Sequence, residues 1–206
     1  MTYGELKQRM TDFGFEEATY TSDPMALSEF ISSINQARQT ISQYFPIKGR
    51  YDFVQDGTET GLHKIDLLNK TETNAEGETV PITFDGTFNS FDSMQMITDG
   101  QVYPFGDYTL EEGHIVVLNY ALKGSFTIFF DKGVSLITED TADGADIGIH
   151  HEAEHLVPLL ASYHAWLDDD IQKATMYWNE YDQLKDQIIM VCRQPRKAQI
   201  IGGIGW

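Results

Sequence analysis

Residues 114–130 read HIVVLNYALKGSFTIFF, two short apolar runs on either side of a glycine. Such runs, separated by Gly, Asn, Asp or Pro, are typical of strands joined by turns. The same texture extends over residues 50–139 and predicts further strands at 62–68, 79–88, 94–98 and 102–110. Asp-Gly pairs at 56–57, 85–86 and 99–100 are turn signals. Their even spacing favours an antiparallel β-sandwich or a jelly roll.

Before this region the pattern is helical. Thr2 and Glu5 have the spacing of a capping box, and the helix that follows is expected to end near Gly14. Asp23 and Pro24 predict a second helix start, and Pro46 its end. One apolar stripe on this second helix comprises Leu27, Phe30, Ile31, Ile34, Ile41, Tyr44 and Phe45, with Ser32, Ser33, Gln36 and Gln39 opposite.

Helical periodicity returns after Asp143. The first of two further helices carries Leu156, Leu159, Leu160, Tyr163 and Leu167 at helical spacing. The second carries Ala174, Tyr177, Trp178, Tyr181, Leu184 and Ile188. Asp168, Asp169 and Asp170 lie between them, where carboxylates favour a helix N-terminus. A connection this short predicts an antiparallel αα-hairpin.

The pattern as a whole predicts an α+β fold. Residues 1–49 and 140–192 are expected to form one helical bundle, and residues 50–139 an inserted antiparallel, jelly-roll-like β-sandwich. Residues 193–206 are expected to form an extended tail. No apolar run approaches the roughly 20 residues of a membrane span, and the N-terminus lacks the apolar core of a secretory signal. We therefore expect synthesis in the cytoplasm and no contact with a membrane.

Charge and cysteine content exclude several functions. Among 206 residues, 14 are basic and 32 acidic, a formal charge of −18. Proteins bind nucleic acid through clustered Lys and Arg side chains, so the excess of acidic residues argues against DNA binding. An acidic surface suits a conduit through which DNA passes, although solubility alone also explains it. The lone Cys192 excludes an intrachain disulfide and a cysteine-based zinc site, and its helical spacing indicates packing.

Residues 151–155, His-Glu-Ala-Glu-His, have the spelling of the zinc-peptidase helix. In that chemistry His151 and His155 would bind zinc, Glu152 would act as base, and Glu180 could be the third ligand. Glu154 argues against a zinc site, because it would place a second charge in a desolvated site without an obvious partner. Pro158 would bend the helix near the ligands, and the aromatic seam leaves Glu180 on the outer face. We expect no metal and no cofactor, and a small zinc peptidase remains the alternative.

Aromatic residues of the sheet region permit another alternative. They are Phe84, Phe88, Phe91, Tyr103, Phe105 and Tyr108. Such residues more often fill the interior of a sandwich, which is the interpretation that we favour. If they lined an exposed face, the chain would be a carbohydrate-binding module.

Three helical segments carry a family resemblance. They are Met1 to Arg9, Tyr44-Phe45-Pro46-Ile47, and Asp169-Asp170 followed by Lys173-Ala174, Tyr177 and Tyr181. Their order, with the Gly-Gly-Ile-Gly-Trp terminus, resembles the head–tail connector proteins of tailed bacteriophages, also called adaptor or head-completion proteins. The match covers both helical ends, a little over half of the chain. The sheet region is a departure from the simplest members, which join the helices by short loops.

The resemblance implies a virion structural protein without catalytic residues. It implies a homo-oligomeric ring, a dodecamer, under the portal protein, with tail or neck proteins beyond it and C-terminal arms that reach into the portal. Genomic DNA would pass through without specific binding. Acidic candidates for the lumen are Glu16, Glu17, Asp168, Asp169 and Asp170.

The composition of residues 193–206 is consistent with an arm that docks on another protein. Pro195 ends the helical pattern, and the residues after it combine cations with apolar side chains that the tail cannot easily bury by itself. Docked in a groove, each apolar side chain could contribute about 1.5–3 kcal/mol, against the cost of ordering the chain. The predicted partner-binding residues are Arg193, Arg196, Lys197, Ile200, Ile201, Ile204 and Trp206.

Overall fold

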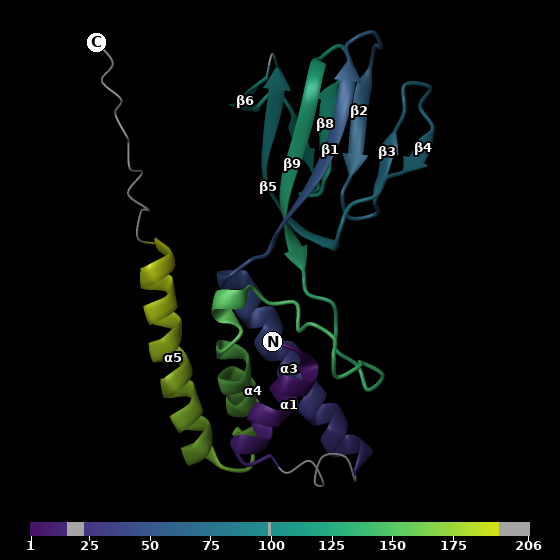
Figure 1. Cartoon of the computed structure of the whole chain (residues 1–206). Coiled ribbons are helices and arrows are strands. Elements are labelled where there is room, and N and C mark those ends of the chain that lie inside the picture. Colours follow the sequence, from purple (N-terminus) through teal and green to yellow (C-terminus); the bar gives the residue numbers. More distant parts are fainter. Residues whose placement is uncertain (16–22, 99, 194–206) are drawn as a thin grey trace, which may run out of the picture. The chain divides into compact units, whose positions relative to one another are not determined.

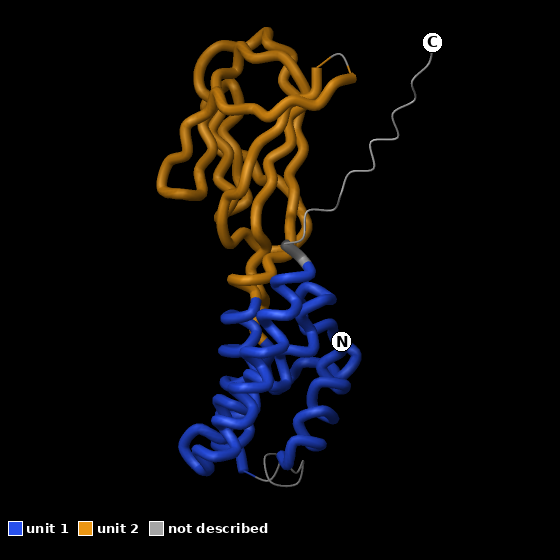
Figure 2. The backbone as a smooth tube through the Cα atoms, turned by 90° about the vertical axis from the view of Figure 1, so that its left-hand side faces the viewer, with its two compact units in different colours: residues 1–41, 137–206 blue, residues 42–136 orange. Residues whose placement is uncertain are grey.

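Helices from the two ends of the chain and strands from its middle form separate units in the computed structural model, which describes residues 1–15, 23–98 and 100–193. The helical unit takes its residues from 1–41 and from 137 onward (Figure 2). The β unit takes residues 42–136. Because all strand pairs are antiparallel and the helices are segregated from them, the predicted α+β class is confirmed.

Local signals fix both ends of helix α1 (Tyr3–Asp12). The Thr2 hydroxyl accepts from the Glu5 N–H at 3.3 Å, and the Glu5 carboxylate accepts from the Thr2 N–H at 2.8 Å. The capping box is therefore confirmed. At the other end Gly14 has a φ of 96°, and the Phe15 N–H donates to the Met10 carbonyl at 3.1 Å. This is the left-handed glycine stop that the sequence predicts.

Helix α3 (Pro24–Tyr44) begins and ends where expected. The Asp23 carboxylate accepts from the Met25 N–H at 3.0 Å, and the helix stops two residues before Pro46. Its predicted stripe is only partly right. Tyr44 is exposed, and Ser33, predicted on the polar face, is buried and donates its hydroxyl to the Glu29 carbonyl at 2.9 Å.

A buried arginine holds the helical unit together, which the sequence did not predict. Arg38 is 1% exposed and donates from Nε to the Ile147 carbonyl at 2.7 Å. It also donates from Nη1 to Asn35 Oδ1 at 3.0 Å, and the Asn35 amide pairs with both backbone groups of Ile137. Burial lowers the pKa of Arg38 to about 10, and Asp146 partly opposes this. Through these bonds helix α3 holds Ile137 and Ile147, which follow the β unit in the sequence.

The predicted αα-hairpin consists of α4 (Leu156–Trp166) and α5 (Ile171–Arg193), which lie side by side (Figure 1). The Asp170 carboxylate caps α5 by accepting from the N–H groups of Gln172 and Lys173, each at 3.1 Å. Ala174, Tyr177 and Tyr181 form the buried face of α5. A short 3₁₀ helix, η1 (His151–Ala153), precedes α4.

Two antiparallel sheets form the β unit. The first has the order β1 (Lys48–Asp56), β9 (Lys123–Gly133), β5 (Thr87–Thr98), β6 (Gln101–Pro104). The second has the order β4 (Thr79–Pro81), β3 (Thr71–Thr73), β2 (Leu62–Asp66), β8 (Ile115–Asn119), β7 (Thr109–Glu111). The pairs β1–β9, β2–β8 and β5–β6 are nested in sequence, as expected for a jelly-roll-like sandwich.

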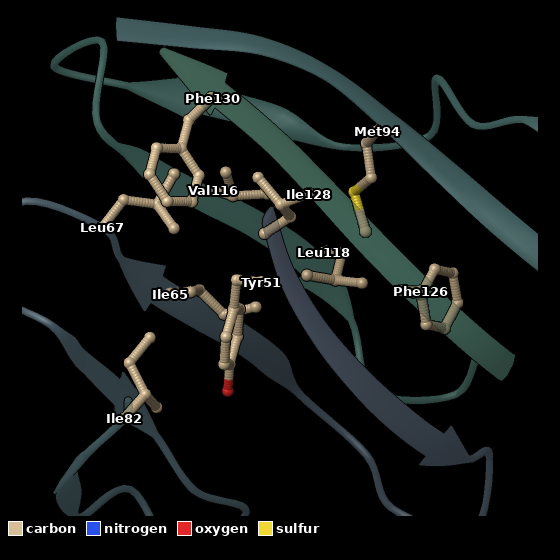
Figure 3. Close-up of a cluster of buried hydrophobic side chains, with 10 residues drawn as sticks. All are labelled: Tyr51, Ile65, Leu67, Ile82, Met94, Val116, Leu118, Phe126, Ile128 and Phe130. Atoms are coloured by element: carbon tan, nitrogen blue, oxygen red, sulfur yellow. The ribbon is translucent and has the colours of Figure 1, made fainter. Parts of the chain in front are cut away.

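Both sheets contribute to one core (Figure 3). Tyr51, Met94, Phe126, Ile128 and Phe130 come from the first sheet, whereas Ile65, Val116 and Leu118 come from the second, and Leu67 and Ile82 flank its strands. At about 1.5–3 kcal/mol for each fully buried large side chain, this shared core is what joins the sheets.

The sequence reading missed two strands, β1 and β3. It also predicted single strands at 79–88 and 102–110, where the structure has β4 and the start of β5, and β6 and β7, in different sheets. Tyr51, Phe53 and Gln55 of β1 alternate with Arg50, Asp52 and Val54, and the first set faces inward. This period-two pattern is the signal that could have found β1. Strand β3 has only three residues, all partly exposed, so it carries no such signal. Over the described residues, none of the helices has the length and apolar character that crossing a membrane requires.

Candidate functional site

The His-Glu-Ala-Glu-His motif does not lie on one helix. Its first three residues form η1, and α4 begins only at Leu156. Pro158 explains this start, because proline lacks the N–H that an interior helical position would donate and is tolerated in the first turn. We expected Pro158 to bend a longer helix; instead it lies in the first turn of a helix that begins after the motif.

The candidate zinc ligands are engaged elsewhere or exposed. The His155 Nδ1 accepts from Arg9 Nη1 at 2.7 Å, since a guanidinium can only donate. The His151 side chain is 79% exposed, and Glu180 is exposed on α5, as predicted. No cluster of three or more His, Cys, Asp or Glu side chains suited to a metal ion occurs within residues 1–15, 23–98 and 100–193.

Glu154 has a partner that the sequence reading did not anticipate. Its carboxylate lies 2.6 Å from the amino group of Met1, and both lie in a pocket of about 350 Å³. Glu5, Gln8, Arg9 and His155 also line this pocket. The expectation that Glu154 is without a partner was therefore wrong, because the start of α1 packs beside it. The motif's charges join α1 to the residues before α4.

The predicted partner-binding tail falls mainly outside the described residues. The last residue of α5 is Arg193, whose side chain is not described, and Arg196, Lys197, Ile200, Ile201, Ile204 and Trp206 lie outside the described chain. Their role stays a prediction.

Helix α5 exposes apolar side chains along its length. They are Ile171, Met176, Trp178, Met190 and Val191. Met190 and Val191 are each 69% exposed and follow Ile188 and Ile189, which are partly buried. These four consecutive residues point to all sides of the helix. A helix that is apolar on all sides is typically buried on all sides by other parts of a protein or assembly. The sequence had placed Trp178 among the buried residues of this helix, which was wrong, and it had not assigned the other four to an exposed face.

Three of the five expected lumen residues lie within the described chain. Asp168 and Asp169 are exposed in the turn between α4 and α5, whereas Asp170 is partly buried and caps α5. Glu16 and Glu17 lie outside the described residues. Of the described candidates, Asp168 and Asp169 are therefore the exposed carboxylates.

The aromatic residues of the β unit mostly pack inward. Phe84, Phe88, Phe91, Phe105 and Tyr108 lie against the shared core, as the core interpretation expects. Tyr103 is the exception, because it is exposed on β6. A flat aromatic platform for a sugar is therefore not formed by this set.

A second pocket, of about 340 Å³, lies in the β unit and was missed by sequence reading. Its charged lining is acidic, from Asp56, Glu59, Glu72 and Glu76. His63 lies in it with its Nε2 3.0 Å from Glu72 Oε2, and its ring stacks on Tyr120 with centroids 4.7 Å apart. His63 shares the inward face of β2 with Ile65, so the alternation of β2 was the available signal.

Comparisons with known proteins leave the family open. A scan against protein-family models and a search of curated proteins both find no match to the chain.

Proposed function

We propose that this protein is a virion structural protein, a ring-forming head–tail adaptor of a tailed bacteriophage that docks under the portal and connects it to the tail. The observation that carries the proposal is the exposed apolar surface of α5. The proposal requires no catalytic residue, and it places the protein at the head–tail junction after its synthesis in the host cytoplasm.

Length is the first reason why α5 needs a partner. It has 23 residues and α4 has 11. At 1.5 Å per residue, α5 is about 35 Å long and α4 about 17 Å, so α5 is about twice as long as α4, and η1 is the other short element that contacts α5. Its last turns hold Met190 and Val191. Burial of both side chains against a neighbouring copy or the portal would contribute about 1.5–3 kcal/mol each.

Chain order supports the same proposal. The described residues on either side of the inserted β unit fold together, with the Tyr177 hydroxyl donating to the Phe13 carbonyl at 2.9 Å. This is the arrangement that the resemblance implies for an adaptor with an inserted domain. The β unit would then contact tail or neck proteins.

Charge is compatible with a DNA conduit. A formal charge of −18, with Asp168 and Asp169 exposed, disfavours the binding of phosphates. Genomic DNA would pass through such a ring without specific binding. A lumen lined mainly by Lys and Arg in a map of the particle would contradict this part of the proposal.

The test is assembly with the portal protein that is encoded nearby. We expect the full chain to form a ring-sized complex with it in analytical ultracentrifugation. Met190→Glu with Val191→Lys should abolish the complex and leave the unfolding transitions unchanged. Gln183→Glu with Gln187→Lys is the matched control, because it places the same charges at exposed polar positions of the same helix. Assembly by the Met190/Val191 variant would refute the role of α5.

A further inference from the structure

Strand β1 forms an edge of the first sheet, and it pairs with β9 alone among the described strands. The Lys132 N–H donates to the Ile47 carbonyl at 2.8 Å, which fixes the alternation of the antiparallel ladder. The odd-numbered residues of β1 therefore direct their backbone groups to β9. Arg50, Asp52 and Val54 direct theirs to the free edge, and none of the described residues pairs with them there. This edge is a row of unpaired donors and acceptors.

The other three sheet edges are protected against pairing. Strand β6 has four residues, whereas β4 and β7 have three each. By the same alternation, Pro104 on β6 and Pro81 on β4 face away from their partner strands, where proline offers no N–H. Short strands and outward prolines are means by which proteins prevent edges from pairing. Strand β1 has nine residues and no proline, so it is the edge to which a further strand can be added.

The acidic pocket of the β unit opens beside this edge. It is lined by residues 53–56 of β1 and by Glu72 and residues 74–76 of the β3–β4 hairpin. The second sheet continues through β3 to β4 beyond β1 (Figure 1), and the Tyr51 hydroxyl on β1 donates to Glu72 at 3.1 Å. A strand added to β1 would therefore lie over this hairpin. Because side chains alternate along a strand, every second one would point toward the pocket.

The charges available in this pocket are negative. Glu59 and Glu76 are exposed and have no hydrogen bond or ion pair with another described residue. Burial, and then the charges of Glu72, Glu59 and Glu76, raise the pKa of Tyr120 to about 12, so the three carboxylates act on the same part of the pocket wall. Lys and Arg are absent among the described residues that line the pocket. A Lys or Arg side chain is therefore the group that this pocket favours.

We propose that β1 receives an extended basic segment of a partner protein as an added strand, with a Lys or Arg side chain of that segment in the acidic pocket. Backbone hydrogen bonds to Arg50, Asp52 and Val54 would supply affinity, and the pocket would supply the preference for a cation. The Val54 side chain, 74% exposed, would be covered by the outer side chains of the segment.

A second copy of the chain fits this edge less well. Antiparallel pairing of two β1 strands would put the β3–β4 hairpins of both copies on the same side of the joined sheet, next to the same edge. A single extended segment brings no hairpin with it. The proposal states how the β unit would bind a tail or neck protein, and in that respect it rests on the proposed function.

Hydrogen exchange of the full chain, followed by NMR without the portal, tests the added strand. In the free chain the amides of Tyr51 and Phe53 should exchange slowly and those of Arg50, Asp52 and Val54 quickly. A short peptide of alternating lysine and valine, with blocked ends, should slow the latter three by about tenfold once about nine chains in ten hold it. The same peptide with glutamate in place of lysine should leave them unchanged. Unchanged exchange with millimolar lysine peptide would overturn the proposal.

Backbone methylation of the peptide separates strand addition from attraction between charges. Only every second N–H of an added strand faces β1, and a one-residue slip would turn the lysines away from the pocket. Methylation of all lysine amides and methylation of all valine amides should therefore differ, one abolishing the slow exchange and the other preserving it. Equal binding of both methylated peptides would show attraction between charges alone and contradict an added strand.

Two substitutions test the pocket. Glu59→Gln with Glu76→Gln should weaken binding of the lysine peptide by roughly three- to tenfold, since each exposed charge contributes little. Glu111→Gln with Glu112→Gln is the matched control, because it removes two exposed carboxylates from another part of the β unit and should change nothing. Equal affinities of the two double variants would refute the role of the pocket.

Other occupants of the edge would have their own signatures. Slow exchange at Arg50, Asp52 and Val54 in the free chain that is lost on deletion of residues 193–206 would assign the edge to the chain's own tail. The same protection together with a dimer in sedimentation would assign it to a second copy. Either result overturns the proposal. Since the portal is absent from these measurements, their failure leaves the adaptor proposal standing, and a failure of portal assembly leaves them unaffected.

Discussion

Gly49 lies against the ring of Phe130, so close that a Cβ at residue 49 would come within 2.5 Å of the ring atom Cε2. The two residues are directly paired between β1 and β9, and Phe130 is fully buried in the shared core. Since close-packed interiors cannot absorb such an overlap without moving the ring or the strand, glycine is required at this position for steric reasons.

Gly49→Ala should therefore destabilise the β unit. We expect a loss of about 1–3 kcal/mol in its free energy of unfolding, the usual cost of overpacking. Gly106→Ala is the matched control, because a Cβ there meets nothing within 4 Å, and its unfolding midpoint should be unchanged or slightly higher. Urea denaturation monitored in the β unit measures both. Equal midpoints for the two variants would show that Phe130 can move aside.

Arg38 is expected to be the most sensitive charged residue of the helical unit. Arg38→Met keeps an apolar stem but removes the donors to the Ile147 carbonyl and to Asn35. Each buried polar group left unpaired costs about 1–3 kcal/mol, so the helical unit should unfold at a clearly lower urea concentration. Arg50→Ala should have almost no effect, because that side chain is 71% exposed and its ion pair with Asp52 lies at the surface.

His164 should make the stability of the helical unit depend on pH. Burial lowers its pKa from 6.5, so the unfolded chain binds a proton at a higher pH than the folded chain does. The stability is fully present above about pH 6.5 and is lost as the pH falls through the lower, folded-state pKa. Urea denaturation at about pH 7.5 and about pH 5 should show this loss, and His164→Phe should reduce it. The exposed His151→Gln is the control, and it should leave the difference between the two pH values unchanged.

The zinc alternative makes its own prediction. Purified protein should contain well under one zinc per chain by elemental analysis, because His155 accepts from Arg9 and His151 lies on a separate 3₁₀ turn. His151→Ala with His155→Ala should leave folding and assembly intact. If the unmodified protein bound one zinc per chain and this double variant did not, the hypothesis of a structural adaptor that binds no metal would be contradicted.

Sequence predicted those features that neighbouring residues determine. The capping box of Thr2 and Glu5, the Asp23 cap and the Gly14 stop each depend on residues within one turn, and all are present. The apolar alternation and turn signals also located most strands.

Features that depend on distant contacts were missed. Arg38 is buried because the chain near Ile147 returns to α3, and Glu154 has a partner because Met1 lies beside it. The pocket around His63 needs β1, β2 and β3 together, and two of these strands were not predicted. A pattern within one segment does not reveal which distant group will contact a side chain. Such sites can therefore be found only when the three-dimensional structure is known.

Deleting residues 193–206 tests the tail. Both cores are built from described residues before this point, so the unfolding transitions should change little. Portal binding should be lost, because Arg196, Lys197 and the apolar residues Ile200, Ile201 and Trp206 are the predicted contacts. Trp206→Ala should weaken portal binding if the Trp206 indole is a central anchor of the contact. Truncation of an aromatic anchor often costs about 2 kcal/mol or more, roughly 30-fold in affinity. A truncated chain that binds the portal as tightly as the full chain would exclude a docking arm and leave the exposed end of α5 as the contact.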